Sequence, residues 1–199
     1  MKVLELFAGT RSIGKAFERK GHEVFSVEWN KDFENISLYA DIGQLTVKQI
    51  IKLCGGVPDV IWASPDCTTY SMAGISHHRR INAETGNPDA VSDYAKFCDK
   101  VNKHMLDLIQ ELKPKFYFIE NPRGCLRKGD TRMKPTDIFT NHPNPMFKAP
   151  CHNGDPCHER APRGARTGTQ GIKGSIDRSR IPDLFCDHIV EICESGILL

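Results

Sequence analysis

Apolar runs alternate with amphipathic stretches along the first 64 residues, and this alternation constrains the fold more than any other feature. The runs KVLELFA (2–8), EVFSVEW (23–29) and DVIWAS (59–64) have the length and apolar content of buried strands. The stretches RSIGKAFERKG (11–21) and VKQIIKLCGG (47–56) have helical spacing. Strands separated by helices form parallel sheets covered on both faces. The sequence therefore predicts an α/β fold with a doubly wound, mostly parallel sheet.

The rest of the chain completes one predicted domain, residues 1–199. A helical pattern begins at residue 93 and stops before Pro114, and KFYFIENP (115–122) is read as a further buried strand. Residues 1–122 then form the ligand-binding core. Residues 123–174 are rich in Pro, Gly, Asn, Cys and His and show hardly any period, so they are predicted to be a small irregular insert. Residues 175–199 regain helical spacing and are expected to return to the core.

Composition indicates how the chain is stabilised, in which compartment it is expected and which part of it would contact nucleic acid. A chain of 199 residues with 39% hydrophobic and 26% charged content can bury a core without disulfides. The sequence shows no secretory signal and no apolar run that could span a bilayer, so the eight cysteines are expected to be thiols or metal ligands in a prokaryotic or phage-infected cytoplasm. Net charge is only +2, but Lys and Arg crowd residues 123–180, and any contact with nucleic acid is expected there.

Polar or glycine residues follow several predicted strands at the edge where open parallel sheets bind ligands. Gly9 would let the backbone approach a ligand, Glu28 could accept hydrogen bonds from ribose hydroxyls, and Trp29 could cover an adenine face. Asp41 marks a third strand end. Singly, these residues also fit a generic turn, helix caps and a core indole. Found in order along the chain, they favour a cofactor that carries a nucleoside.

The stretch ASPDCTTYS (63–71) places Cys67 at another strand end, behind Pro65 and Asp66. A thiol there would lie beside the cofactor and could act as a nucleophile once it is deprotonated. Asp66 would raise the pKa of the thiol if it pointed inward, so we expect it to face solvent or to cap the following turn. The other reading of a cysteine, a small buried apolar side chain, suits Cys54, Cys98, Cys186 and Cys193 better.

Three motifs give the chain a resemblance to the DNA cytosine-C5 methyltransferases, as a compact member of phage or prophage type. LELFAGTRSIGKAF (4–17) resembles the family's cofactor turn, SPDCTTYS (64–71) its Pro-Pro-Cys-Gln loop and IENPRG (119–124) its Glu-Asn-Val motif. Arg11 and Ser12 replace glycines, Asp66 the second Pro, Thr68 the Gln and Pro122 the Val. The resemblance implies a Rossmann-like methyltransferase fold and S-adenosylmethionine as cofactor. The residues that would hold this cofactor are Phe7, Ala8, Gly9, Thr10, Ser12, Glu28, Trp29, Asp41, Ile42, Ser64 and Pro65.

The same resemblance implies an enzyme, a DNA (cytosine-5-)-methyltransferase, with DNA as its partner. Cys67 would add to C6 of a flipped cytosine while Glu120 holds N3 and the 4-amino group. Arg163 or Arg166 would contact the O2 edge of the base, although a plain phosphate contact fits either one equally well. Two other readings stay open: a catalytically silent regulator that keeps the binding surfaces, and an enzyme that acts on RNA cytosine. The oligomeric state is left open.

The insert also gathers residues that could bind a metal. APCHNGDPCHER (149–160) carries two Cys-His pairs, and Cys125 follows the strand at 115–122 closely enough to meet them. Four N or S ligands suit structural zinc, which stabilises small segments that lack a core. The candidate ligands are Cys125, Cys151, Cys157 and His158. Ordinary loop chemistry explains the same residues equally well, because one of the usual Cys-x2-Cys pairs is missing.

Overall fold

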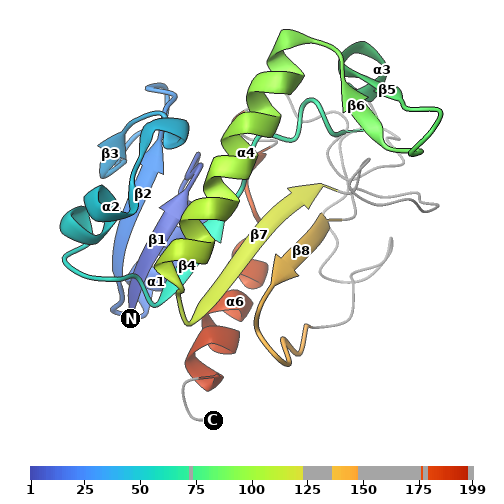
Figure 1. Ribbon diagram of the computed structural model, residues 1–199. Coiled ribbons are helices and arrows are strands. Elements are labelled where there is room, and N and C mark those ends of the chain that lie inside the picture. The colour runs from blue at the N-terminus through green and yellow to red at the C-terminus, as the bar shows by residue number, and fades with distance from the viewer. Residues whose placement is uncertain (72–73, 123–135, 148–175, 177–178, 197–199) are drawn as a thin grey trace.

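The structure, a computed structural model, describes residues 1–71, 74–122, 136–147, 176 and 179–196. Its centre is a six-stranded sheet in the order β3-β2-β1-β4-β7-β8 (Figure 1). The first five strands in this order run parallel, and β8 is antiparallel to β7. The predicted α/β fold with a mostly parallel sheet is thus confirmed. The strands are β1 (Lys2–Leu6), β2 (Glu23–Glu28), β3 (Leu38–Tyr39), β4 (Val60–Ala63), β7 (Phe116–Pro122) and β8 (Thr136–Thr140).

Helices cover both faces of the sheet (Figure 1). On one face, α1 (Ser12–Arg19) and α6 (Asp183–Ser195) bury a cluster that includes Phe17, Trp62, Phe118 and Ile189. On the other face lie α2 (Val47–Leu53) and α4 (Asp93–Leu112), with the short 3-10 helix η1 (Ile42–Gln44) beside them. Neighbouring residues of β4, Ile61 and Trp62, point into opposite clusters, as the alternation of side chains along a strand requires.

Local signals in the sequence explain where the helices of this second face begin and end. Thr46 caps α2 in a capping box with Gln49, in which each side chain accepts from the other residue's backbone N–H. Ser92 caps α4 by accepting from the Ala95 amide. At its other end, α4 stops at Lys113 in a left-handed conformation, one residue before Pro114, as the sequence predicts.

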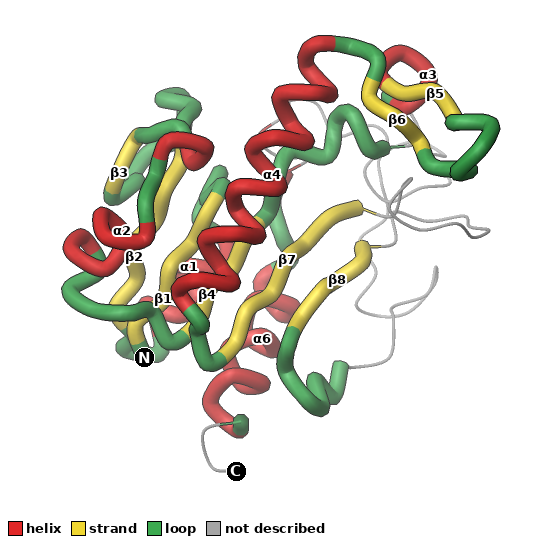
Figure 2. The backbone as a smooth tube through the Cα atoms, viewed as in Figure 1, coloured by secondary structure: helices red, strands yellow, loops and turns green. Residues whose placement is uncertain are grey.

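Two regions differ from the prediction. The irregular insert is wrong for Thr136–Thr140, which forms β8 because Ile138 packs on the core cluster of α1 and α6 while the backbone pairs with β7. Residues 75–90, for which no helix or strand was predicted, fold into α3 (Ile75–His78) and a hairpin of β5 (Arg79–Ile81) and β6 (Pro88–Ala90), at the N-terminal end of α4 (Figure 2). These segments are too short to show a period. Among the described helices, none is both long and apolar enough to cross a bilayer.

Candidate active site

The turn after β1, residues 7–11, is here called the cofactor turn. Phe7, Gly9 and Arg11 all have positive φ, at 55°, 50° and 58°, so the chain reverses tightly before α1 begins. This conformation costs little at glycine and more at the other two residues. Backbone bonds offset that cost: the Ala8 amide donates to the Val27 carbonyl at 3.1 Å, and the Arg11 amide donates to the Ala8 carbonyl at 2.7 Å.

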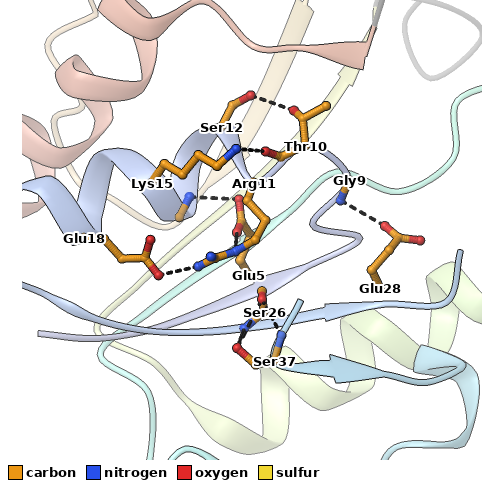
Figure 3. A network of polar contacts seen from close by, with 11 residues as sticks. Glu5, Gly9, Thr10, Arg11, Ser12, Lys15, Glu18, Ser26, Glu28 and Ser37 are labelled. Atoms are coloured by element: carbon orange, nitrogen blue, oxygen red, sulfur yellow. Dashed lines mark hydrogen bonds and ion pairs between the residues drawn. The ribbon is translucent and has the colours of Figure 1, made fainter. Parts of the chain in front are cut away.

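Glu28, at the end of β2, ties the cofactor turn to the neighbouring strand (Figure 3). Its Oε2 accepts from the Gly9 amide at 3.0 Å, and its Oε1 accepts from the amides of Trp29 and Asn30 at 2.9 and 3.0 Å. The side chain is buried, at 5% exposure. A carboxylate offers about four acceptor directions. Three are used by backbone donors, so Glu28 keeps about one for a ligand, where the sequence suggested that it could serve two ribose hydroxyls.

Beneath the cofactor turn lies an ionic cluster of Glu5, Arg11 and Glu18, in which Glu5 and Arg11 are buried and Glu18 is exposed (Figure 3). Glu5 accepts from the Gly14 amide at 2.9 Å, and its Oε2 lies 3.8 Å from Arg11 Nε, while Arg11 Nη2 donates to Glu18. Burial raises the pKa of Glu5 to about 7, against the opposing effect of the Gly14 hydrogen bond and the Arg11 charge. Arg11, which stands where a glycine was expected, thus places its guanidinium between the Glu5 and Glu18 carboxyl groups.

The other residues predicted to hold the cofactor near the adenine, Trp29, Asp41 and Ile42, follow the ends of β2 and β3. Trp29 is 67% exposed and available as a stacking surface, whereas Ile42 is only 3% exposed and belongs mainly to the core. Asp41 caps η1 by accepting from the Gly43 amide at 2.8 Å. Asp41 also lines a cavity of about 240 Å³ between η1 and α4, together with Phe97. The exposed ring of Phe97 was not singled out in the sequence because it shares the helical spacing of α4 with its apolar neighbours.

The second turn at this edge, residues 65–71, is called the Cys67 loop. It follows β4, where the Ser64 amide donates to Leu6 of β1 and the Ser64 hydroxyl accepts from the Trp62 indole at 2.8 Å. The Cys67 carbonyl accepts from the amides of Tyr70 and Ser71 at 3.0 and 2.8 Å, which closes a helical turn. Cys67 itself is half-buried. Its side chain is therefore placed on the surface of a compact turn and not in the core.

Asp66 behaves as the sequence predicted. It is exposed, and its Oδ1 accepts from the Thr68 amide at 2.6 Å, which caps the turn, while Oδ2 accepts from the Tyr94 hydroxyl of α4. Burial raises the pKa of Asp66, but the hydrogen bonds from Thr68 and Tyr94 outweigh that effect and leave it below its ordinary value. Asp66 therefore stays ionised near neutral pH and supplies stiffness that a second proline would otherwise give.

The end of β7 lies next to the Cys67 loop. Ala63, the last residue of β4, pairs with Ile119 of β7. Glu120 therefore lies on β7 one residue beyond the level at which β4 ends and the chain continues into the Cys67 loop. Asn121 is buried at 2% exposure, and its Nδ2 donates to the Pro65 carbonyl at 3.5 Å. Its Oδ1 is buried with no hydrogen-bond partner among the described residues. The structure thus brings the thiol and the Glu120 carboxyl to adjacent strand ends.

A polar cluster that the sequence did not reveal supports the Cys67 loop from the other side. Arg79 of β5 donates to Thr69 and to Asp99 of α4, and Tyr70 donates to Asp99 at 2.5 Å. Hydrogen bonds from Arg79 and Tyr70 outweigh the effect of burial and lower the pKa of Asp99. In the sequence, Arg79 stands in the run HHRR (77–80), which is typical of a solvated surface.

Several predicted site residues lie outside the described residues: Arg163, Arg166, Cys125, Cys151, Cys157 and His158. The zinc site therefore stays a prediction that metal analysis of untagged protein would test. Within the described ranges, no group of three or more His, Cys, Asp or Glu side chains is arranged to hold a metal ion. Cys98, Cys186 and Cys193 are buried thiols as predicted, and Cys54 is half-buried. Burial raises the pKa of all four.

Known proteins are similar to part of this chain. A type II methyltransferase of Fusobacterium nucleatum, M.FnuDI, is 26% identical over 140 residues, which cover 66% of this chain and 35% of that protein. Two solved structures show 20% identity. One, an Escherichia coli prophage protein described as a DNA modification methyltransferase, has a TM-score of 0.46 and matches 63% of this chain and 33% of its own. The other, a Spodoptera frugiperda DNMT2 mutant, has a TM-score of 0.39 and matches 61% and 35%.

The chain spans about a third of the length of these proteins. The family model for C-5 cytosine-specific DNA methylases matches residues 1–140, which include the cofactor turn, the Cys67 loop and the end of β7. Since this match covers well over half of the chain, the protein belongs to the C-5 cytosine-specific DNA methylase family.

Proposed function

We propose that this protein methylates C5 of cytosine in DNA, with S-adenosylmethionine as the methyl donor and Cys67 as a covalent nucleophile. The observation that carries the proposal is the meeting of three elements at one edge of the sheet. The cofactor turn leaves β1, the Cys67 loop leaves β4, and Glu120 lies near the end of β7, and these three strands are consecutive in the sheet. Ligands of open parallel sheets bind at this edge.

The residues at the edge fit the cofactor. A side chain built at Gly9 would have nothing nearer than Phe33 at 3.9 Å, so the backbone there lies open to a ligand. The remaining acceptor direction of Glu28 suits one ribose hydroxyl, and the exposed Trp29 ring suits stacking on a purine. Asp41, beside the cavity between η1 and α4, would accept from an adenine amino group in this proposal. When bound, the cofactor supplies an electrophilic methyl group.

Cys67 would start the reaction on the base. Its thiolate would add to C6 of cytosine. The electron pair of the C5–C6 double bond then shifts into the C4–C5 bond and that of the C4–N3 double bond onto N3, which leaves an enamine with a nucleophilic C5. Glu120 would donate a hydrogen bond or proton at N3 and accept from the 4-amino group, which neutralises the charge that develops. C5 would then take the methyl group as its bond to the sulfonium sulfur breaks, and the cofactor would leave as a neutral thioether. Loss of the C5 proton restores the double bond and expels the thiolate.

Two further groups assist in this proposal. Asn121 follows Glu120 along β7 and its Nδ2 donates to the Pro65 carbonyl at 3.5 Å, so this side chain would hold the end of β7 beside the Cys67 loop. Arg163 or Arg166 remains our candidate for the O2 edge of the base. Because C6 is unreachable in a stacked duplex, the cytosine must be flipped out of the helix.

A trapping experiment tests the proposal. Oligonucleotides that contain 5-fluorocytosine should form a covalent complex with the wild-type protein and S-adenosylmethionine, because the fluorine cannot leave as the proton does. Cys67→Ser should form none. DNA and RNA oligonucleotides are run in parallel with tritiated cofactor to show which polymer is methylated. Cofactor binding without any trapping would replace the proposal with the catalytically silent regulator, and labelling of RNA alone would replace DNA as the substrate.

Calorimetry tests the cofactor site separately. Glu28→Ala leaves three backbone amides without their acceptor and removes the proposed ribose contact. We expect the affinity for S-adenosylmethionine to fall at least about tenfold, since hydrogen bonds to charged groups contribute about 1.5 to 3 kcal/mol each. Glu34→Ala, at an exposed position in the following loop, is the matched control. Equal affinities for wild type and Glu28→Ala would contradict the assignment.

A further inference from the structure

Arg79 is a buried cation outside the residues that the proposed chemistry uses. It opens β5 and is only 5% exposed. Burying a guanidinium is costly unless it is paired and hydrogen-bonded. The structure meets that requirement with partners from three separate segments: the Cys67 loop, the β5–β6 hairpin and helix α4. A side chain that joins three segments fixes their relative positions.

The first set of contacts reaches the Cys67 loop at Thr69, two residues after the thiol. Arg79 Nε donates to the Thr69 carbonyl at 3.0 Å, and Nη2 donates to the Thr69 hydroxyl at 3.1 Å. Thr69 has no exposed surface. The guanidinium also lies over the ring of Tyr70, with Cζ 4.0 Å from the ring centroid. Main chain and side chains of the loop are thus both held.

The second set of contacts reaches α4. Both carboxylate oxygens of Asp99 accept from Arg79, Oδ1 from Nη2 at 2.6 Å and Oδ2 from Nη1 at 3.1 Å. Tyr70 donates to the same Oδ1 and accepts from Asn102 at 2.9 Å. Arg79 Nη1 also donates to the Pro88 carbonyl of β6 at 3.3 Å. Because the apolar face of α4 packs on the sheet, these hydrogen bonds connect the Cys67 loop to the core through α4.

We propose that Arg79 is a positioning residue for methyl transfer, which holds the Cys67 loop against α4 so that the thiol meets C6 of the flipped base. This inference rests on the proposed function. Its physical basis is that covalent catalysis depends on the placement of the nucleophile, and an error of 1 Å can cost about a hundredfold in rate. Arg79 is not a catalytic residue, since its contacts are with the loop, the hairpin and α4.

The geometry requires arginine at this position. The planar fork of the guanidinium donates at once to Thr69, Asp99 and Pro88, in directions that a single ammonium group cannot serve together. Lysine would keep the charge opposite Asp99 but lose most of the hold on Thr69. The conservative change Arg79→Lys therefore separates charge from geometry.

The experiment compares Arg79→Lys and the milder Asp99→Asn with Arg80→Lys. Arg80 is the neighbouring exposed arginine of β5, and within the part of the chain that the structure describes its guanidinium donates to the carbonyls of Ser76 and Arg79. Single-turnover methyl transfer and 5-fluorocytosine trapping are measured with saturating DNA and cofactor. For Arg79→Lys we expect both rates to fall by about ten- to a hundredfold. The KM for DNA and the Kd for S-adenosylmethionine should stay within about twofold, as a positioning role requires.

Hydrogen exchange tests the hold on the loop without any catalysis. The amides of Tyr70 and Ser71 donate to the Cys67 carbonyl, and they should exchange at least about tenfold faster in Arg79→Lys than in wild type. Amides of α1 and β1 should be unchanged in the same sample, which excludes general unfolding. Asp99→Asn should show the same pattern more weakly. Arg80→Lys should show neither effect.

The two measurements separate the inference from the function on which it rests. If wild type transfers no methyl group and never forms the covalent complex, the proposed function fails. Hydrogen exchange then tests by itself whether Arg79 holds the Cys67 loop, a role here called the Arg79 anchor. Faster exchange in Arg79→Lys supports the anchor, and unchanged exchange contradicts it. If wild type is active but Arg79→Lys transfers methyl groups at the wild-type rate, the inference is overturned. A loss of rate matched by a loss of cofactor affinity would also overturn it, because the cause would then lie outside the loop.

Discussion

The cofactor turn and the Cys67 loop leave adjacent parallel strands at the same edge of the sheet, but different kinds of contact hold them. The cofactor turn is held mainly through its backbone, by the Glu28 carboxylate and the Val27 carbonyl of the neighbouring strand. The Cys67 loop is held largely through side chains of a hairpin and a helix that come later in the chain. Two turns in equivalent places therefore differ in which substitutions they tolerate.

The difference explains the departures from the family motifs. Because backbone contacts carry the cofactor turn, side chains such as Arg11 and Ser12 fit there, provided that Arg11 finds Glu5 and Glu18. In the Cys67 loop, Asp66 stands in place of a proline and restores stiffness by bonding to Thr68 and Tyr94. The cofactor turn depends on backbone contacts and on the space that Gly14 leaves for the Glu5 carboxyl. The Cys67 loop depends on specific polar side chains. Three predictions test this contrast.

The largest effect is expected beneath the cofactor turn, at Gly14. A side chain there would place its Cβ 2.3 Å from Glu5 Oε2, and the same carboxyl group is held through Oε1 by the Gly14 amide. Gly14→Val should lower the free energy of unfolding by roughly 4 kcal/mol, through overpacking and loss of a buried charged hydrogen bond. Lys15→Val, at the next and exposed position of α1, should cost about 1 kcal/mol or less. Urea unfolding measures both, and equal losses would contradict the idea that space beneath the turn is decisive.

A smaller effect is expected from the ionisation of Glu5. Its pKa is raised to about 7 in the folded protein from an ordinary 4.5, so the folded state binds more protons between these values. Stability should therefore fall as pH rises from 5 to 8, by roughly 2 to 3 kcal/mol for this group.

Glu5→Gln should remove that part of the slope. Glu23→Gln, where the side chain is 78% exposed, should leave it as in wild type. Urea unfolding at a series of pH values makes the comparison. A slope in Glu5→Gln as steep as in wild type would show that the buried Glu5 carboxyl does not govern the pH dependence of stability in this range.

The smallest effect is expected at the Asp66–Tyr94 contact of the Cys67 loop. A double-mutant cycle of Asp66→Ala and Tyr94→Phe should give a coupling of about 1 kcal/mol at neutral pH. Since the folded-state pKa of Asp66 lies below its ordinary value of 3.8, the coupling is present above that value and is lost as pH falls below it. No coupling at neutral pH would mean that the loop relies on the Arg79 anchor alone.

By itself, the sequence determined the architecture and the edge that carries the candidate site. The strands at 2–6, 23–28, 60–63 and 116–122 and the helices between them follow from local burial patterns, which each segment carries in its own residues. The positions of Cys67, Glu120, Glu28 and Asp41 at strand ends followed from that pattern. The capping role of Asp66 was also predictable, because the amide it accepts from lies only two residues away.

Tertiary structure alone decided what holds these residues. Nothing local distinguishes the buried Arg79 from the exposed Arg80, because the difference arises from Asp99, twenty residues later on α4. Likewise, β8 becomes a strand only because β7 offers an unpaired edge and the core accepts Ile138. Glu28 spends most of its acceptor capacity on backbone amides, one of them nineteen residues away. Hydrogen bonds over such separations depend on the folded arrangement of segments, which no periodicity within one segment encodes.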